Sequence, residues 1–358
     1  MNYKIGLFIL AVSSIYNIAV AQKSFSVDGT LFGRQIQTNV DNELAKTMLT
    51  KPEDSDALQL FSEYSTRENS TETLYEITQK YSVDVASLFF VEKLYSQVKN
   101  RCAQNYYLSA IDTISAVQNV RQLSFLQNYY IVFVPGLMYK NAKNGSNFLN
   151  QRRLLDSIGI RNEMINIDEI GFVEDNAEII AHRLRELSIY HDNIILVSVS
   201  KGSLETAIAL EKISNHQEFS FVKAWVNVGG ILRGTPIADY WAPLYHRTWM
   251  SCGLFFIGKR IELKAILFNL SYKRCKEKYK TFKIPAEITV VNLIGVPLGR
   301  QKKPKIYAPN DGFSPLPDAI FEEGIVIIEP GVDHFFKGID LNKRMIAILY
   351  YINELLCI

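Results

Sequence analysis

The sequence has almost no excess charge and few cysteines, and both scarcities narrow the functions it can serve. Its 358 residues carry a formal net charge of +2 at pH 7, and charged residues make up 21% of the chain. Such a small excess produces no strong field for nucleic acid or an anionic membrane surface, so we expect neither partner. The four cysteines, Cys102, Cys252, Cys275 and Cys357, lack the spacing of zinc ligands, and no metal site is predicted.

Long apolar runs are also missing, except for a short one at the N-terminus. There Lys4 supplies a positive charge, residues 5–12 are largely apolar, and Ala19-Val20-Ala21 matches an A-x-A cleavage pattern. The apolar stretch is too short to span a membrane. We therefore predict that residues 1–21 are a signal peptide cleaved near Ala21. The mature protein is then expected to be secreted or periplasmic, with no integral membrane segment.

Export bears on the cysteines, because an oxidising compartment allows them to pair. Four cysteines have three connectivities. Cys252 and Cys275 lie in the same segment, and a bond between them would close a loop of about two dozen residues and contribute roughly 3 kcal/mol. Free buried thiols fit the pattern equally well. The sequence therefore leaves the pairing open, and it leaves the oligomeric state open as well.

Beyond residue 125 the chain alternates between buried-looking strands and amphipathic helices. Continuous apolar runs predict strands at 129–134, 163–167, 193–199, 221–228, 288–294 and 324–329. Helical periodicity is clear at 175–190, 202–213 and 342–355. This alternation predicts an α/β fold over residues 126–358, with a mostly parallel sheet of about six strands and helices on both faces.

Two regions fall outside this alternation. Residues 22–125 are polar and helix-leaning, and we predict a mainly helical N-terminal extension there. Residues 236–285 interrupt the sheet between two core strands and are rich in large apolar and basic side chains. An insertion at this place lies above the carboxyl ends of the strands, where ligands bind in open α/β sheets. We favour a substrate-covering cap in which Trp241 and Trp249 contact substrate; a helical pair that packs only on itself is the alternative.

One predicted strand runs directly into a serine that is flanked by small residues. Residues 193–202 read Asn-Ile-Ile-Leu-Val-Ser-Val-Ser-Lys-Gly and are followed by a helix-competent segment. A sharp strand-to-helix turn of this kind holds a serine hydroxyl exposed above the sheet as a nucleophile. Small residues are needed two positions before and after Ser200, because the strand and the helix approach closely there. The usual form is G-x-S-x-G, and Ser198 replaces its first glycine.

A serine hydroxyl needs a base, and the sequence has only five histidines. His334 follows the last predicted strand through a Pro330-Gly331 turn, which places it on the same rim of the sheet as Ser200. We therefore predict His334 as the base. The other histidines lie on a polar helix face, in turns or loops, or in the insertion: His182, His191, His216 and His246.

The base in turn needs an acid that orients its ring. Asp311 lies in an Asn-Asp-Gly turn after the strand at 288–294, and we expect that turn to expose its carboxylate. Asp311 is the predicted acid. The competing carboxylates are Asp318, Glu322 and Glu323, together with Asp333, which adjoins the histidine and is expected to point elsewhere.

The chain order Ser200, Asp311, His334 is that of the α/β-hydrolase fold, and several segments resemble bacterial secreted lipases and esterases of that superfamily. Residues 132–139 resemble the strand and oxyanion loop, and residues 226–239 resemble the segment after a later strand. Residues 309–312 resemble the acid loop, and residues 331–334 resemble the histidine loop. The resemblance covers roughly residues 128–358 and leaves out the N-terminal third.

The resemblance implies an oxyanion hole made by the backbone N–H groups of Lys201 and Leu137, with Gly136 letting the chain turn inward beside the substrate. It also implies an exported serine hydrolase that cleaves an acyl ester through an acyl-enzyme, with no cofactor or metal. Small-molecule and lipid esters are the expected substrates. A catalytically silent protein of the same fold, binding a glycan, lipid or protein partner, is the alternative suggested by Ser198 and by the undefined N-terminal third.

Overall fold

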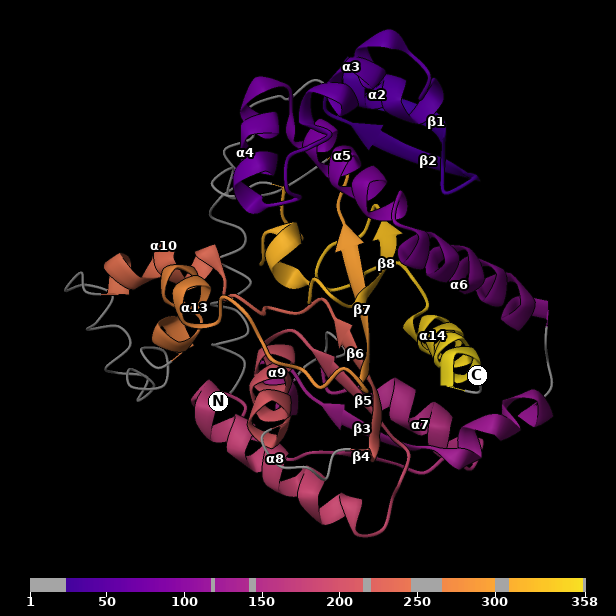
Figure 1. Cartoon of the computed structure of the whole chain (residues 1–358), viewed down its shortest axis with the longest axis vertical. Helices are drawn as coiled ribbons and strands as arrows, with labels where there is room; N and C mark the ends of the chain where they lie inside the picture. Colours follow the sequence, from indigo (N-terminus) through magenta and orange to yellow (C-terminus); the bar gives the residue numbers. More distant parts are fainter. Residues whose placement is uncertain are drawn as a thin grey trace.

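A parallel sheet of six strands forms the centre of the molecule (Figure 1). The structure is a computed structural model and describes residues 24–116, 120–141, 146–214, 220–245, 266–299 and 309–356. The strand order is β4-β3-β5-β6-β7-β8, and every neighbouring pair is parallel. The strands are β3 (Tyr130–Val134), β4 (Asn162–Met164), β5 (Ile194–Val199), β6 (Val222–Val228), β7 (Thr289–Val296) and β8 (Ile325–Pro330). All six predicted strands are present, and only their ends shift.

Some predicted features lie outside the described residues, namely the signal peptide at 1–21, Trp249, Cys252 and Cys357. Of the other cysteines, Cys102 is exposed and Cys275 is buried. The Cys275 thiol donates to the Asn269 carbonyl oxygen at a distance of 3.0 Å. Within the described ranges, no helix is both long enough and apolar enough to cross a membrane.

Helices cover both faces of the sheet, as the alternating pattern predicts (Figure 1). One face packs mainly against α8 (Val173–Ser188) and α9 (Lys201–Ser214), and the other against α6 (Val98–Ala116), α7 (Leu149–Ser157) and α14 (Leu341–Leu356). Leu196 and Trp225 lie in the first core, whereas their neighbours Ile195 and Val226 lie in the second. The strands are continuously apolar because alternate residues point into two buried cores. Short 3₁₀ helices flank β3 at η1 (Val120–Asn128) and η2 (Tyr139–Asn141).

The N-terminal region contains strands as well as helices. The helices are α2 (Glu43–Thr50), α3 (Ser55–Tyr64), α4 (Thr71–Lys80), α5 (Val83–Tyr95) and the long α6. They follow an antiparallel hairpin of β1 (Phe25–Leu31) and β2 (Arg34–Val40). The sequence predicted a mainly helical extension and did not anticipate the hairpin. Its residues are mostly exposed or half-buried, so they form no apolar run that would have indicated a strand.

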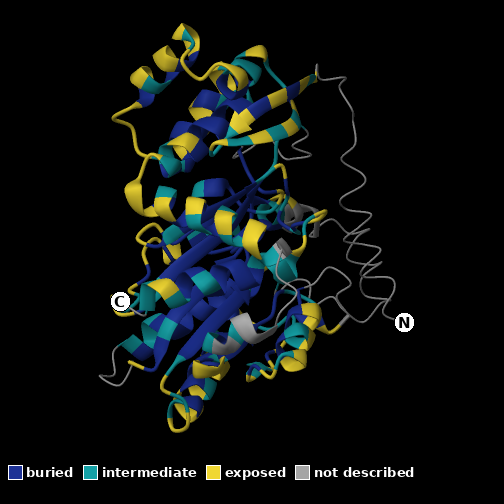
Figure 2. Cartoon of the chain, turned by 90° about the vertical axis from the view of Figure 1, so that its right-hand side faces the viewer, coloured by how far each residue is buried: buried dark blue, intermediate teal, exposed yellow. Residues whose placement is uncertain are grey.

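The N-terminal region shares a hydrophobic core with the sheet. Leu74 and Phe89 of its helices are buried in the same apolar cluster as Ile294, Val296 and Ile328 of β7 and β8. Figure 1 shows α2 to α5 beyond the ends toward which β7 and β8 point. Figure 2 shows buried residues continuing from the sheet into this region. The carboxyl ends of two core strands are therefore covered by the N-terminal helices.

Helix α6 closes the outer edge of β8 with two side-chain amides one helical turn apart. Gln104 donates to the carbonyl of Ile328 at 3.1 Å and accepts from its N–H at 2.8 Å, while Asn100 accepts from the N–H of Val326 at 2.8 Å. Both amides are buried. An edge strand normally exposes unpaired backbone groups. Here α6 of the N-terminal region satisfies three of these groups at the edge where the sheet ends.

A second polar contact joins the N-terminal region to the loop after β7. The buried Asp84 carboxylate accepts the N–H of Asp41 at 2.7 Å and that of Gly299 at 3.0 and 3.1 Å. Burial, together with the nearby Asp41 carboxylate, raises the pKa of Asp84 to about 7. The contact therefore holds a carboxyl group that resists ionisation.

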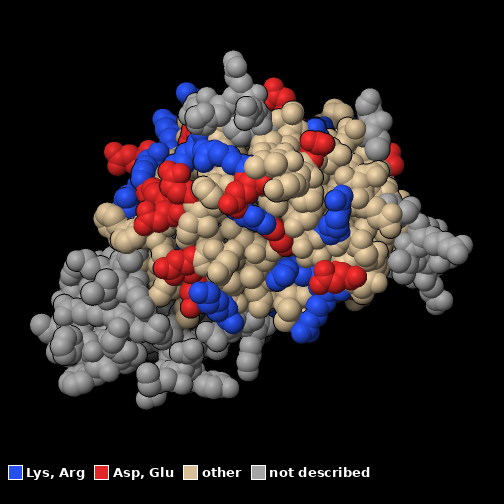
Figure 3. Space-filling model, turned by 90° about the horizontal axis from the view of Figure 1, so that it is seen from below, with Lys and Arg blue, Asp and Glu red and all other residues tan. Residues whose placement is uncertain are grey.

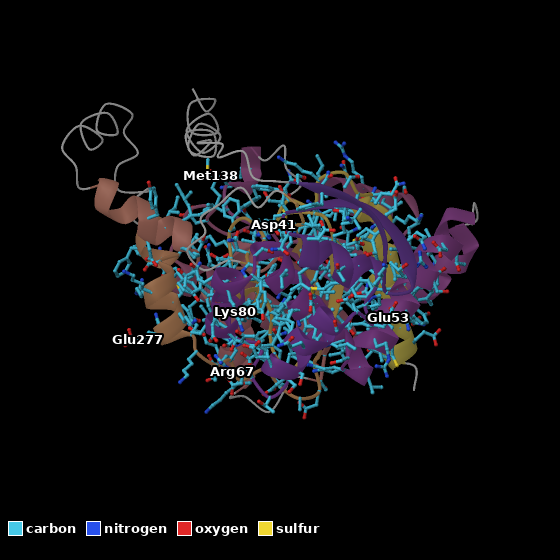
Figure 4. All side chains as sticks on the ribbon, turned by 90° about the horizontal axis from the view of Figure 1, so that it is seen from above. Asp41, Glu53, Arg67, Lys80, Met138 and Glu277 are labelled. Carbon is cyan, nitrogen blue, oxygen red and sulfur yellow. The ribbon has the colours of Figure 1, made fainter. Side chains whose placement is uncertain are left out.

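The insertion contains α10 (Pro236–Tyr245) and α13 (Tyr272–Lys278) and is held to the fold at its base. Asp318, in the 3₁₀ helix η3 (Leu316–Ala319), accepts hydrogen bonds at 2.6 Å from both Tyr272 of α13 and Thr71 of α4. One buried carboxylate thus joins the insertion, the N-terminal region and the segment between β7 and β8. Viewed from above, the N-terminal elements carrying Asp41 and Lys80 lie over the sheet, and the helix carrying Glu277 stands to one side (Figure 4).

The described surface mixes charges of both signs. On the face seen from below, lysine and arginine side chains are interspersed with aspartate and glutamate (Figure 3). Ion pairs such as Arg183 with Glu163 at 2.8 Å are of this mixed kind. This mixed arrangement accords with the small net charge of the sequence.

Changing Gln104 to leucine should lower the free energy of unfolding by about 1–3 kcal/mol, because it leaves the backbone groups of Ile328 buried without partners. Unfolding in urea measures the change. The matched control is Asn105→Leu, an exposed amide next along the same helix. Its bond from the Tyr95 hydroxyl at 3.0 Å is open to solvent, so its loss should change stability by less than about 0.5 kcal/mol. Equal losses in the two variants would contradict the edge-closing role of Gln104.

Changing Asp84 to asparagine should alter how stability depends on pH. Because folding raises the pKa of Asp84 from 3.8 to about 7, the folded state binds a proton at this carboxyl group more tightly than the unfolded state does. The bound proton therefore contributes fully to the free energy of unfolding below about pH 4, and this contribution is lost as the pH rises through about 7. Between these two pH values, the free energy of unfolding of the wild type should fall by on the order of 3 kcal/mol relative to that of Asp84→Asn. Urea unfolding at a series of pH values tests this, with the exposed Asp28→Asn as the control; parallel curves for wild type and Asp84→Asn would refute it.

Candidate active site

Ser200 lies in a strained turn between β5 and α9. Its backbone φ is +56°, in the left-handed region that non-glycine residues rarely adopt. The turn is fixed from outside: the N–H of Ser200 donates to the Val228 carbonyl at 3.2 Å, and the Ser200 carbonyl accepts from Ile231 at 3.2 Å. The predicted strand–serine–helix turn is therefore present, and the end of β6 supports it.

The two small residues that flank Ser200 have different physical roles. A Cβ at Gly202 would lie 2.3 Å from the Pro135 carbonyl oxygen, so no side chain fits there. Ser198, in contrast, has a buried hydroxyl that accepts from Trp225 Nε1 at 2.7 Å and lies 2.9 Å from the Ser203 hydroxyl. Glycine at position 198 would leave the indole N–H of Trp225 without this acceptor. The departure from G-x-S-x-G therefore has a local cause.

The structure brings together the three side chains that the sequence predicted as catalytic. His334 Nε2 lies 3.0 Å from Ser200 Oγ, and His334 Nδ1 lies 2.8 Å from Asp311 Oδ2. His334 and Asp311 are 5% and 2% exposed, respectively. The backbone also joins the two loops, because the N–H of His334 donates to the Asp311 carbonyl at 2.8 Å. A half-buried hydroxyl, a buried imidazole and a buried carboxylate are thus aligned in one row.

The Asn-Asp-Gly turn does not expose the Asp311 carboxylate, and that expectation was wrong. The N–H groups of Phe313 and Ser314 donate to Asp311 Oδ1 at 2.8 and 2.7 Å, while Oδ2 faces His334. These contacts turn the carboxylate inward. They also compensate its loss of hydration, because hydrogen bonds to a buried charged group offset the cost of burying it.

The competing acids are used elsewhere in the structure. Asp318 accepts from Thr71 and Tyr272, and Asp333 accepts the N–H of Phe335 at 3.0 Å. Glu322 and Glu323 are exposed.

Two aromatic rings that the sequence analysis missed lie beside the histidine. The ring centroid of Phe313 lies 4.7 Å from that of His334, and Phe335 meets the imidazole edge-on at 5.6 Å. Both phenylalanines are half-buried. They adjoin Asp311 and His334 in the sequence, which is the signal that could have identified them as neighbours of the site.

The loop after β3 approaches the serine closely at Gly136. A Cβ on Gly136 would lie 3.4 Å from the Ser200 Cβ. The N–H groups of Gly136 and Met138 donate to Ser146 and Glu169 at 3.0 and 3.2 Å, and no turn or loop hydrogen bond of the described residues engages the N–H of Leu137. Lys201 opens α9, where the first N–H groups of a helix have no partner within it. The two N–H groups predicted as oxyanion donors are therefore not committed to the fold.

The Lys201 side chain is buried and forms an ion pair with Glu205, one helical turn later. Burial raises the pKa of Glu205 to about 7, although the charge of Lys201 acts in the opposite direction. Asn176 of α8 donates to the same carboxylate oxygen at 2.6 Å. The sequence predicted a role only for the backbone of Lys201. The i, i+4 spacing of Lys201 and Glu205 on a predicted helix was the available signal for the pair.

The remaining residues named from the sequence lie outside the described residues or elsewhere on the structure. Trp241 lies in α10, but its side chain falls outside the described residues, as do Trp249, His216 and His246. His182 is exposed, and His191 stacks on Tyr130 with ring centroids 3.9 Å apart. Among the described residues, no group of three or more histidine, cysteine, aspartate or glutamate side chains is arranged to hold a metal ion.

Comparison with known proteins gives structural neighbours only. No protein-family model matches the sequence, and no curated protein matches it. A metagenomic carboxyl esterase is 21% identical with a TM-score of 0.47, over 64% of this chain and 76% of the esterase. The mature form of a Bacillus licheniformis lipase is 19% identical with a TM-score of 0.45, over 62% of this chain and 89% of the lipase. Phospholipase PlaB from Legionella pneumophila is 12% identical with a TM-score of 0.41, over 63% of this chain and 58% of PlaB.

The fold follows from the arrangement of the chain itself. The sheet is parallel in the order β4-β3-β5-β6-β7-β8, with helices on both faces. The serine follows β5 at a strained strand-to-helix turn, the aspartate follows β7 and the histidine follows β8. With this sheet, this turn and this chain order, the protein has the α/β-hydrolase fold.

Proposed function

We propose that the chain is an exported serine hydrolase that cleaves acyl esters through a covalent acyl-enzyme. The observation that carries the proposal is the row of contacts from Asp311 to His334 at 2.8 Å and from His334 to Ser200 at 3.0 Å. Such a row lets a weakly nucleophilic hydroxyl lose its proton as it attacks. The strained turn at Ser200 supports the same reading, because strain of this kind is concentrated at functional sites.

In the first half of the proposed reaction, Ser200 Oγ attacks the ester carbonyl carbon and His334 Nε2 takes the hydroxyl proton. Asp311 accepts the Nδ1–H of the ring, which fixes the tautomer and stabilises the imidazolium that forms. The carbonyl oxygen becomes an oxyanion, and the backbone N–H groups of Lys201 and Leu137 donate to it. His334 then returns the proton to the leaving alcohol as the carbon–oxygen bond breaks.

In the second half, water replaces the alcohol. His334 takes a proton from the water as its oxygen attacks the acyl carbon, and the same two N–H groups stabilise the second oxyanion. The bond to Ser200 Oγ then breaks, the serine regains its proton, and the carboxylic acid leaves. Every proton passes through His334 Nε2, so the described side chains balance the reaction by themselves.

The proposed substrates are small-molecule or lipid esters. Support comes from the half-buried rings of Phe313 and Phe335 beside His334, which offer an apolar contact for an acyl or alcohol group. From the sequence alone, Trp241 and Trp249 of the insertion are proposed to contact the substrate. The hydrogen bonds of Thr71 and Tyr272 to Asp318 join the insertion to the fold at its base, which suits a covering element.

Changing Ser200 to alanine should abolish the reaction with a fluorophosphonate probe, because the attacking oxygen is gone. In the wild type that oxygen displaces fluoride and forms a bond to phosphorus that mass spectrometry locates. The same change should lower kcat by on the order of a million-fold if the three side chains act as a unit. A panel of p-nitrophenyl esters of increasing acyl length provides the assay.

The control for this test is Ser109→Ala, an exposed serine on α6, which should label and turn over like the wild type. Folded wild type that neither labels nor cleaves any ester of the panel would refute the proposed hydrolase and favour the catalytically silent, binding-only alternative. Labelling that persists in Ser200→Ala would show that another nucleophile reacts.

Export is proposed from the N-terminal charge, apolar stretch and A-x-A pattern. Expressed from Met1 in a bacterial host, the protein should be recovered from the periplasm with an intact mass that begins near Gln22. Changing both Ala19 and Ala21 to arginine should block cleavage, because the signal peptidase requires small residues at these positions. Wild-type protein that stays in the cytoplasm with Met1 attached would contradict export.

A further inference from the structure

A chain of buried polar contacts runs between the two proposed oxyanion donors. It begins at Lys201, whose side chain is 2% exposed and pairs with Glu205 Oε1. The Glu205 side chain is completely buried, and its second oxygen accepts no hydrogen bond within the described part of the chain. The carboxylate is therefore oriented by Lys201 and by its one other partner, Asn176.

Asn176 links Glu205 of α9 to the loop after β4, which comprises residues 165–172. Its Nδ2 donates to Glu205 at 2.6 Å and to the Asp168 carbonyl at 2.8 Å, and its Oδ1 accepts the Asp168 N–H at 3.0 Å. The amide is completely buried on α8. One side chain thus fixes both backbone groups of Asp168 relative to the elbow helix.

The loop after β4 then holds the loop after β3. The Glu169 carbonyl accepts the N–H of Met138 at 3.2 Å, and the Ile167 carbonyl accepts the Tyr139 hydroxyl at 2.9 Å. Met138 directly follows Leu137. These contacts therefore connect the Lys201 side chain, through α9, α8 and the loop after β4, to Met138, the residue next to the second donor.

The fold alone does not call for charge at this place. Burying an ion pair costs desolvation energy that the pair seldom recovers, and a well-packed apolar pair is usually at least as stable. Orientation is what a charged, hydrogen-bonded pair adds, because its partners must meet at defined angles and distances. An oxyanion hole needs this property, since its donors act only when they lie 2.7–3.1 Å from the developing charge.

We propose that Glu205 is a positioning residue that holds the N–H groups of Lys201 and Leu137 at one fixed separation. The role rests on the proposed hydrolase function. Glu205 touches neither the substrate nor the reacting atoms; it acts through the Lys201 side chain on one side and through Asn176 and the 165–172 loop on the other. Through these contacts, a single carboxylate sets the geometry of a hole that is built from two separate loops.

The test compares three variants by their kinetics with one p-nitrophenyl ester. The double change Lys201→Met with Glu205→Leu replaces the ion pair by an apolar pair of similar volume, so the protein should stay folded. It should lower kcat about 10- to 1000-fold while KM changes less than about threefold, because the lost interaction is made in the transition state. Glu205→Gln keeps the shape and an acceptor for Asn176 and should lose less activity. The affinity for a trifluoromethyl ketone, which forms an oxyanion on Ser200, should fall in parallel with kcat/KM.

The matched control is Lys212→Met. Lys212 also joins α9 to α8 through an ion pair, with Glu178, but that pair is exposed to solvent. This variant should keep wild-type kcat, KM and ketone affinity. If the double variant melts like the wild type and also keeps its kcat, the buried pair serves only the fold and the proposal is overturned.

A second measurement does not depend on activity. Hydrogen exchange of a peptide covering residues 134–141 should be faster in the double variant than in the wild type, and unchanged in Lys212→Met. Unchanged exchange in the double variant would overturn the coupling even if kcat falls. A wild type that is inert to every ester and to fluorophosphonate would defeat the proposed function instead, and the exchange data would then decide the coupling on their own.

Discussion

The left-handed backbone of Ser200 sets the positions of three neighbouring elements. A non-glycine residue in this conformation costs of order 1–3 kcal/mol and persists only where its surroundings hold it. Here the hydrogen bonds to Val228 and Ile231 tie the turn to the end of β6, and Gly202 packs directly on the carbonyl of Pro135. The turn, β6 and the loop after β3 can therefore move only together. The proposed nucleophile and both proposed oxyanion donors belong to this one unit.

The sheet and the row of three polar side chains were predictable because their signals are local. Each strand is a continuous apolar run, since both faces of the sheet are covered by helices. Ser200, Asp311 and His334 each follow such a run, and the carboxyl ends of parallel strands meet at one edge. Sequence order and strand direction were then enough to bring the three residues together. No knowledge of side-chain packing was needed.

The features that the sequence did not reveal depend on partners far away in the chain. Asn176 of α8 contacts Glu205 of α9, and the sequence around either residue does not indicate this contact. The expectation that Asp311 is exposed failed for a related reason. A turn motif predicts the backbone path, whereas the direction of the carboxylate also depends on His334, which lies on another loop. The β1–β2 hairpin was missed because it is largely solvated and lacks an apolar run.

The N-terminal region has a physical connection to the site although it lies outside the core sheet. The segment that carries Asp311 is bound to this region on both sides: Gly299 donates to Asp84 before it, and Asp318 accepts from Thr71 after it. Between these two points Asp311 makes its own contact with His334. An acid that must stay within hydrogen-bond distance of an imidazole benefits when nearby residues are held in place, because its carboxylate then has fewer alternative positions in the folded state. The region that seals the edge of β8 therefore also anchors the loop of the proposed catalytic acid, and the separation into an extension and a hydrolase domain describes the sequence better than it describes the packing.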